Sequence, residues 1–107
     1  MKLFLDATNN LKTIIKLDDR QFIKTYTSPR DQDIFAFLLQ IIKEQSLDLK
    51  KISEIEVNPG PGSFTGSRLG VAIANALAFS LNIKVNGQQP PINPLYSQNT
   101  TWKENPR

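Results

Sequence analysis

The stretch NPGPGSFTGSR, residues 58–68, joins a predicted strand to a predicted helix. Before it, residues 52–57 alternate apolar and polar side chains and are rich in β-branched residues, which is typical of a short strand. After it, residues 69–81 form a run of Leu, Val, Ile and Ala that is long enough for a helix. Prolines restrict their neighbours and glycines accept angles that side chains forbid, so the sequence predicts a shaped turn here.

Two interpretations of this glycine turn stay open. In one, its free amides receive a phosphate at a helix N-terminus. In the other, it is a tight turn that lets helix and strand pack closely, with a hydroxyl side chain capping the helix. A P-loop would need a different glycine spacing and a lysine, and a dinucleotide site would need an acid about 20 residues later, which this chain lacks. The residues concerned are Gly60, Gly62, Ser63, Thr65 and Gly66, with Ser63 or Thr65 as the cap.

The composition of the 107 residues narrows the chemistry. Thirteen basic against ten acidic residues give a net charge of +3, too small and scattered to argue by itself for nucleic-acid binding. The chain has no cysteine and no histidine, which removes thiolate metal sites and the commonest general base. We predict no metal and no cofactor. No stretch reads as a membrane span or a signal peptide, so we expect a cytoplasmic protein without a membrane partner.

The remaining pattern predicts one small α/β domain over residues 1–87. Three strands joined by short polar turns should form an antiparallel meander, followed by helix, strand, helix and a short last strand. The predicted ranges are 2–6, 11–17 and 21–27 for the first strands, 31–45 for the helix, and 83–85 for the last strand.

Residues 88–107 differ from the rest because they hold four of the seven prolines together with many polar residues. They predict a flexible tail. Trp102 in this tail is either an anchor or an exposed aromatic.

Asp6 closes the first predicted strand and has two interpretations. An acid that faces a turn can hold a metal or a water molecule of a nucleotide. It can equally cap the turn by accepting hydrogen bonds from nearby backbone.

Both predicted helices carry more apolar surface than one contact with a sheet requires. The two helices can cover each other only in part, so we predict a partner surface on them. Small side chains such as Ala74 and Ala76 would let another helix approach, and a large charged residue at either position is expected to abolish partner binding while leaving the fold. The predicted interface residues are Ile34, Phe35, Phe37, Leu38, Ile41, Leu69, Ala72, Ile73, Ala76 and Leu77.

The stretch PGPGSFTGSRLGVAIANALAFSLNIKVNG resembles the signature of the bacterial TsaB (YeaZ) family, whose loop reads close to GRGPGSFTGVRIGV. The residues 60–66 match without a break, and Asp6-Ala7-Thr8 is similar to the Asp-Thr-Ser/Thr of the family. The chain departs from the family at Asn58-Pro59, where Gly-Arg is usual, and at Gln32, which replaces a histidine. The resemblance covers about residues 2–87. It implies a single actin-like, ribonuclease-H-like (ASKHA) lobe with a mixed five-stranded sheet, the second lobe being absent.

The resemblance implies that this chain is a non-catalytic partner subunit. In that family, TsaB pairs with the paralogue TsaD, which carries the metal and the active site. Together with the ATPase TsaE, they transfer a threonylcarbamoyl group to the N6 of an adenosine in tRNA. The implied partners are TsaD or a second copy of this chain, bound through the helices 31–45 and 66–81, with TsaE in the complex and tRNA met only indirectly. The alternatives are a minimal nucleotide-binding ATPase or phosphotransferase that uses residues 60–66 and Asp6, and a truncated relic that self-associates.

Overall fold

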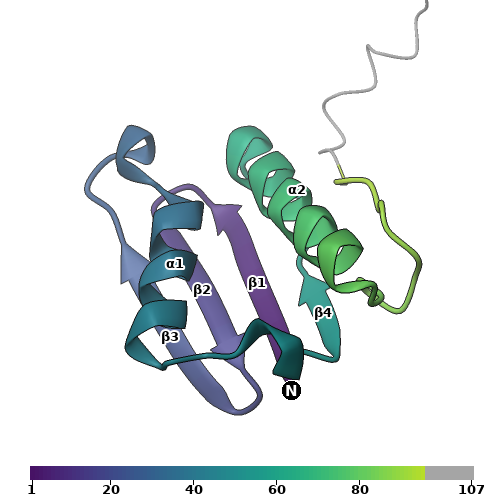
Figure 1. Cartoon of the computed structure of the whole chain (residues 1–107). Helices are drawn as coiled ribbons and strands as arrows, with labels where there is room; N and C mark the ends of the chain where they lie inside the picture. Colours follow the sequence, from purple (N-terminus) through teal and green to yellow (C-terminus); the bar gives the residue numbers. More distant parts are fainter. Residues whose placement is uncertain (96–107) are drawn as a thin grey trace, which may run out of the picture.

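Four strands form one mixed sheet in the structure, a computed structural model that describes residues 1–95 (Figure 1). The strands β1 (Lys2–Asn9), β2 (Lys12–Leu17) and β3 (Arg20–Thr25) are successively antiparallel, and β4 (Glu54–Val57) pairs with β1 in parallel. The order across the sheet is β3-β2-β1-β4. The expected meander and the α/β class are therefore confirmed.

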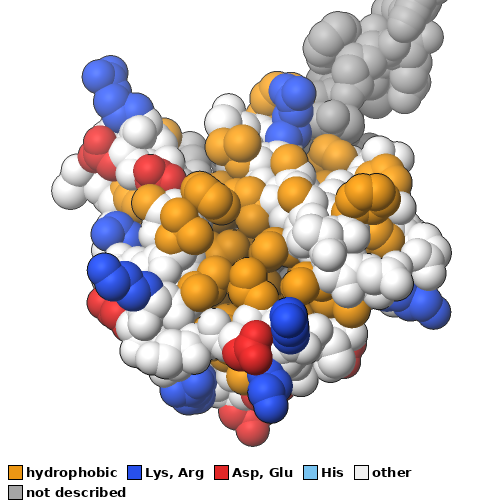
Figure 2. Space-filling view, viewed as in Figure 1, with side chains coloured by type: hydrophobic (Ala, Val, Ile, Leu, Met, Phe, Trp, Pro, Cys, Tyr) orange, Lys and Arg blue, Asp and Glu red, His pale blue; other side chains and the backbone are white. Residues whose placement is uncertain are grey.

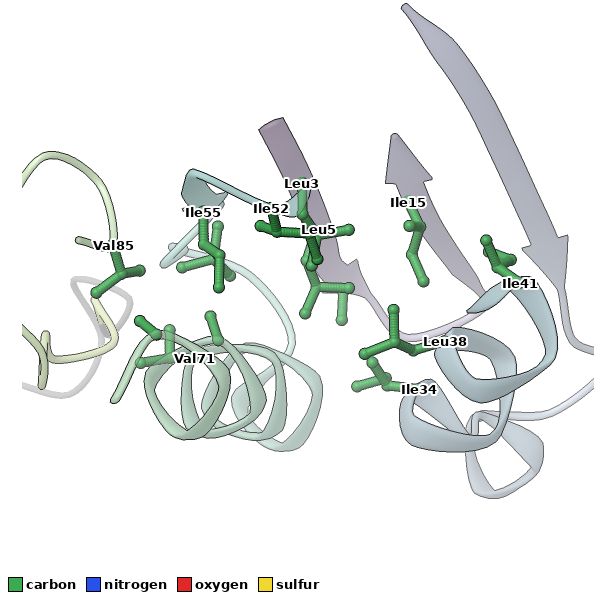
Figure 3. Close-up of a cluster of buried hydrophobic side chains, with 14 of the residues drawn as sticks. Leu3, Leu5, Ile15, Ile34, Leu38, Ile41, Ile52, Ile55, Val71 and Val85 are labelled. Carbon is green, nitrogen blue, oxygen red and sulfur yellow. The ribbon is translucent and has the colours of Figure 1, made fainter. Parts of the chain in front are cut away.

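The core lies between this sheet and two helices, α1 (Ile34–Glu44) and α2 (Phe64–Leu81), which cover the same face (Figure 1). Alternate strand residues point to this face, as the two-residue period of a strand requires. Figure 3 shows Leu3, Leu5 and Ile15 of the sheet facing side chains from both helices. The inward side chains of β1 and β2 are Leu3, Leu5, Ala7, Thr13, Ile15 and Leu17, all about 1% exposed or less.

The predicted helix over residues 31–45 is two separate elements. A single 3-10 turn, Pro29–Asp31, is capped by Ser28, whose Oγ accepts from the amide of Arg30. Gln32 then has extended backbone angles, and α1 begins only at Ile34, capped by the Asp33 carboxylate at 3.0 Å from the Ala36 amide. Asp33 therefore caps the long helix, which begins three residues later than predicted.

The predicted fifth strand is wrong among the described residues. Val85 makes only isolated bridges, to Ile55 and to Gln88. The chain does not continue as a strand beside β4, because the side chain of Asn86 already bonds to the backbone of Val57. Asn86 Oδ1 accepts from Val57 N at 2.8 Å, and Asn86 Nδ2 donates to Val57 O at 3.0 Å. The amide of Asn86 thus replaces one peptide group of a fifth strand, and the sheet has four strands.

By length and composition alone, α2 could cross a membrane, since it is 18 residues long and mostly apolar. This differs from the expectation that no stretch is long enough. The core helix of a globular domain meets the same criterion, and α2 packs along β1 and β4. Its residues Gly66, Ser67, Gly70, Val71, Ala74 and Ala78 are buried there.

Candidate functional site

The glycine turn brings the start of α2 against the end of β1. Ser63 is the helix cap, with its Oγ accepting from the Gly66 amide at 3.2 Å, and its own amide donates to the Thr8 carbonyl at 2.7 Å. A Cβ atom on Gly66 would collide with the carbonyl oxygen of Ala7, and one on Gly62 would lie 2.6 Å from the Cβ of Thr8. Both glycines are therefore explained by close packing of helix on strand.

Asp6 is predicted to close the first strand, but β1 continues to Asn9, so Asp6 lies inside the strand. Both oxygens of its carboxylate accept hydrogen bonds. Oδ1 accepts from the Thr8 amide at 3.0 Å and from the Thr8 hydroxyl at 2.7 Å. Oδ2 accepts from Asn58 Nδ2 at 3.1 Å. These bonds tie β1 to the loop that follows β4, as the capping interpretation of this acid predicts.

A hollow of about 410 Å³ lies beside the turn, lined by Thr8, Asn9, Asn10, Pro61, Gly62 and Ser63. Asp6 is not among its lining residues. Residues 1–95 contain no group of three acids that could hold a metal ion. Thr65 lies outside this hollow, exposed on α2. The structure therefore brings Ser63, Gly62 and Thr8 together at the turn, and the residues that line this hollow are uncharged.

Gln32 contributes to this region in a way that the sequence did not reveal. Its Nε2 donates to the Asn9 carbonyl at 3.1 Å and to the Thr13 hydroxyl at 3.0 Å, and its Oε1 would meet a Cβ on Gly66 at 3.1 Å. The side chain thus joins the β1–β2 turn to the start of α2. No local pattern could have indicated this, because the partners lie 19 and 23 residues away.

Residues 88–95, which belong to the predicted tail, pack along one flank of α2. Asn75 forms a reciprocal pair with Ile92: Nδ2 donates to the Ile92 carbonyl, and Oδ1 accepts from the Ile92 amide, both at 2.9 Å. The Leu95 amide then donates to the Pro59 carbonyl at 2.6 Å. We call residues 88–95 the strap. Trp102 lies outside the described residues.

The outer sides of α1 and α2 form an apolar surface that nothing in the described chain covers. Figure 2 shows hydrophobic side chains gathered over both helices and the space between them. Phe79 is 79% exposed, Phe35 56%, and Leu39 and Leu69 48% each. Ile73 and Leu77 are partly buried between core and surface. We call the exposed set the helix face; its members are Phe35, Leu39, Leu69, Ala72, Ala76 and Phe79.

Four of the predicted interface residues belong to the core instead. Ile34, Phe37, Leu38 and Ile41 are at most 8% exposed, because their side of α1 packs on the sheet (Figure 3). Ala74 is likewise fully buried, while Ala76 is exposed. A charge at Ala74 would therefore disturb the fold, which corrects the expectation that it would affect only a partner.

The comparison with protein families agrees with this architecture. Residues 31–88 match the family model of TsaD, described as tRNA N6-adenosine threonylcarbamoyltransferase. The match runs from Asp31, the last residue of the 3-10 turn, through α1, β4, the glycine turn and α2. It covers more than half of the chain, and the chain belongs to this family.

The curated relatives place the chain on the TsaB (YeaZ) side of the family. It is 36% identical over 52 residues to the tRNA threonylcarbamoyladenosine biosynthesis protein TsaB of Haemophilus influenzae. It is 32% identical over 54 residues to the protein of that name from Buchnera aphidicola of Schizaphis graminum, and 51% identical over 35 residues to that of Bacillus subtilis. These matches cover 33% to 50% of this chain but only 15% to 26% of the relatives.

A solved structure has the same arrangement over a larger part of the chain. YeaZ from Pseudomonas aeruginosa superposes with a TM-score of 0.63 at 24% identity, covering 78% of this chain and 40% of its own. A second structure from that organism, an uncharacterized protein with similarity to peptidase YeaZ, also gives 0.63, at 25% identity. The chain therefore corresponds to less than half the length of these proteins, which is consistent with a single lobe.

Proposed function

We propose that this chain is a non-catalytic partner subunit that binds a TsaD-like protein and supports threonylcarbamoyl transfer to adenosine in tRNA. The observation that carries the proposal is the helix face: large apolar side chains stand exposed on two neighbouring helices. Exposed apolar surface of this kind usually marks a protein interface, because leaving it in water costs free energy. The names of the relatives support the assignment to tRNA modification. The TsaD-like partner comes from the resemblance to the TsaB family.

The proposal that the chain is not itself catalytic has separate support. The Asp6 carboxylate and the Ser63 hydroxyl are both engaged in bonds within the turn. A general base or nucleophile needs a neighbouring group that can exchange a proton with it and with a substrate. The hydrogen-bond partners of both residues belong to the turn itself, the Thr8 hydroxyl beside Asp6 included, so their arrangement fits a structural turn.

The test is sedimentation of this protein, alone and mixed with TsaD from the same organism. We expect a heterodimer that forms in preference to self-association. A homodimer that TsaD leaves unchanged would mean that the helix face serves a second copy of this chain, and the tRNA assignment would lose its main support.

A pair of variants connects the result to the helix face. Leu69→Glu places a charge on α2, and Ile23→Glu places the same charge on β3, on the sheet surface opposite the helices; both side chains are 48% exposed. We expect Leu69→Glu to abolish the heterodimer and Ile23→Glu to leave it intact, with unchanged circular dichroism in both. Equal binding by the two variants would place the interface elsewhere.

A further inference from the structure

Arg68 is the single charged residue of α2, at the edge of the helix face. It is exposed, and its guanidinium carbon lies 4.8 Å from the centre of the Phe64 ring, one helical turn earlier. A cation held against an aromatic ring loses less conformational entropy when it binds than one that moves freely. The structure therefore presents a partly fixed positive charge beside an apolar surface.

A surface hollow adjoins this charge. It has a volume of about 300 Å³ and is lined by Thr65, Arg68, Leu69 and Ala72. Leu69 and Ala72 belong to the helix face, so the hollow and the face are continuous. A side chain of a docked partner that entered this hollow would meet the guanidinium on one side and apolar atoms on the other.

Arg68 has no acidic partner in the described part of the chain. The ion pair found among residues 1–95 joins Lys2 and Glu56 at 2.8 Å. The sequence holds no Asp or Glu between Glu56 and Glu104, so the glycine turn, α2 and the strap are free of negative charge. A partner that covers the helix face would remove water from this guanidinium, and an unpaired charge there would oppose binding.

We propose that Arg68 is the charge anchor of the helix face and that it pairs with a carboxylate of TsaD. This proposal rests on the proposed function. The partner surface that fits is apolar with one Asp or Glu, whose two oxygens match the paired N–H groups of a guanidinium. A nucleic-acid phosphate fits less well, because α2 offers one cation and phosphate binding needs several.

The experiment measures the dissociation constant of the full chain for TsaD from the same organism at low and high salt. The variants are Arg68→Ala and Arg68→Glu, with Lys84→Glu as a control for charge at an exposed position beyond the end of α2. We expect Arg68→Ala to weaken binding on the order of tenfold to a hundredfold and to reduce its salt dependence. Arg68→Glu should weaken it further, and Lys84→Glu should change it by less than about threefold.

Paired charge-reversal variants identify the TsaD residue that binds Arg68. Each exposed Asp or Glu of TsaD is replaced in turn by Arg and tested against Arg68→Glu, and one of these changes should restore binding. Wild-type affinity in Arg68→Ala, or no rescue by any acid, would overturn the anchor while leaving the docking proposal in place. Failure of the wild-type chain to bind TsaD would overturn both. Loss of tRNA binding with unchanged TsaD binding would assign Arg68 to phosphate instead.

Discussion

The two sides of α2 have similar apolar composition but opposite environments. Ala74 and Ala78 are fully buried against the sheet, while Ala72 and Ala76, two residues away from Ala74, are exposed. The same contrast holds for large side chains, since Val71 is 2% exposed and Phe79 is 79% exposed. The two apolar sides of α2 therefore have different roles. One side holds the fold together, and the other is available to a partner.

The largest expected effect is on the buried side. Ala74→Glu would place a charge in the core without a partner, and we expect the chain to lose most of its stability or fail to fold, since such changes cost about 3–5 kcal/mol. Ala76→Glu places the same charge on the exposed side and should change the free energy of unfolding by less than about 0.5 kcal/mol. Urea unfolding of the two variants measures the difference. Equal losses would mean that both sides of α2 are buried in solution.

The second prediction concerns the contact between the start of α2 and β1. Gly66→Ala would push a methyl group into the Ala7 carbonyl, and we expect it to destabilise the fold by about 1–3 kcal/mol. Gly70→Ala is the matched control, because its Cβ would lie 3.5 Å from the Cβ of Ala7, an ordinary contact. Alanine is the better helix former by about 1 kcal/mol, so this control should be neutral or stabilising. Thermal unfolding of both would reject the packing argument if Gly66→Ala were the more stable.

The smallest expected effect is on the flank of α2, where the strap lies. Asn75→Ala removes both hydrogen bonds to Ile92, and we expect a loss of about 1–2 kcal/mol together with faster hydrogen exchange at the Ile92 amide. Ser80→Ala, which removes an exposed bond to the helix's own Leu77 carbonyl, should leave that exchange unchanged. Equal exchange in both variants would mean that other contacts hold the strap.

Much of the fold could be predicted from the chain because the relevant signals are local. The alternation in β1 and β2, the β-branched residues before the glycine turn, and the apolar run after it each depend on neighbours within a few residues. Ser63 as the cap of α2 follows from the same kind of signal. The family motif predicted the arrangement of these elements in space. The comparisons confirm the family and the similarity to the fold of YeaZ.

The errors and omissions have a common physical cause, which is contact between distant residues. The predicted fifth strand makes a single bridge to β4, at Ile55, because Asn86 bonds to Val57, 29 residues away. Gln32 and Asn75 find backbone partners across the fold, and neither has a sequence pattern that indicates it. The predicted interface includes the buried side of α1 because large apolar side chains stand on both sides of this helix, and Gln40 is its single polar residue before Lys43.

By itself, then, the sequence determined the elements, the glycine turn and the presence of surplus apolar surface on two helices. These depend on backbone preferences and on the spacing of apolar residues along one segment. Only the tertiary structure decided which side of each helix is core and which is the helix face, because burial depends on where the sheet lies. It also decided that Arg68 stands at the edge of that face with Phe64 beneath it and no acid beside it among residues 1–95.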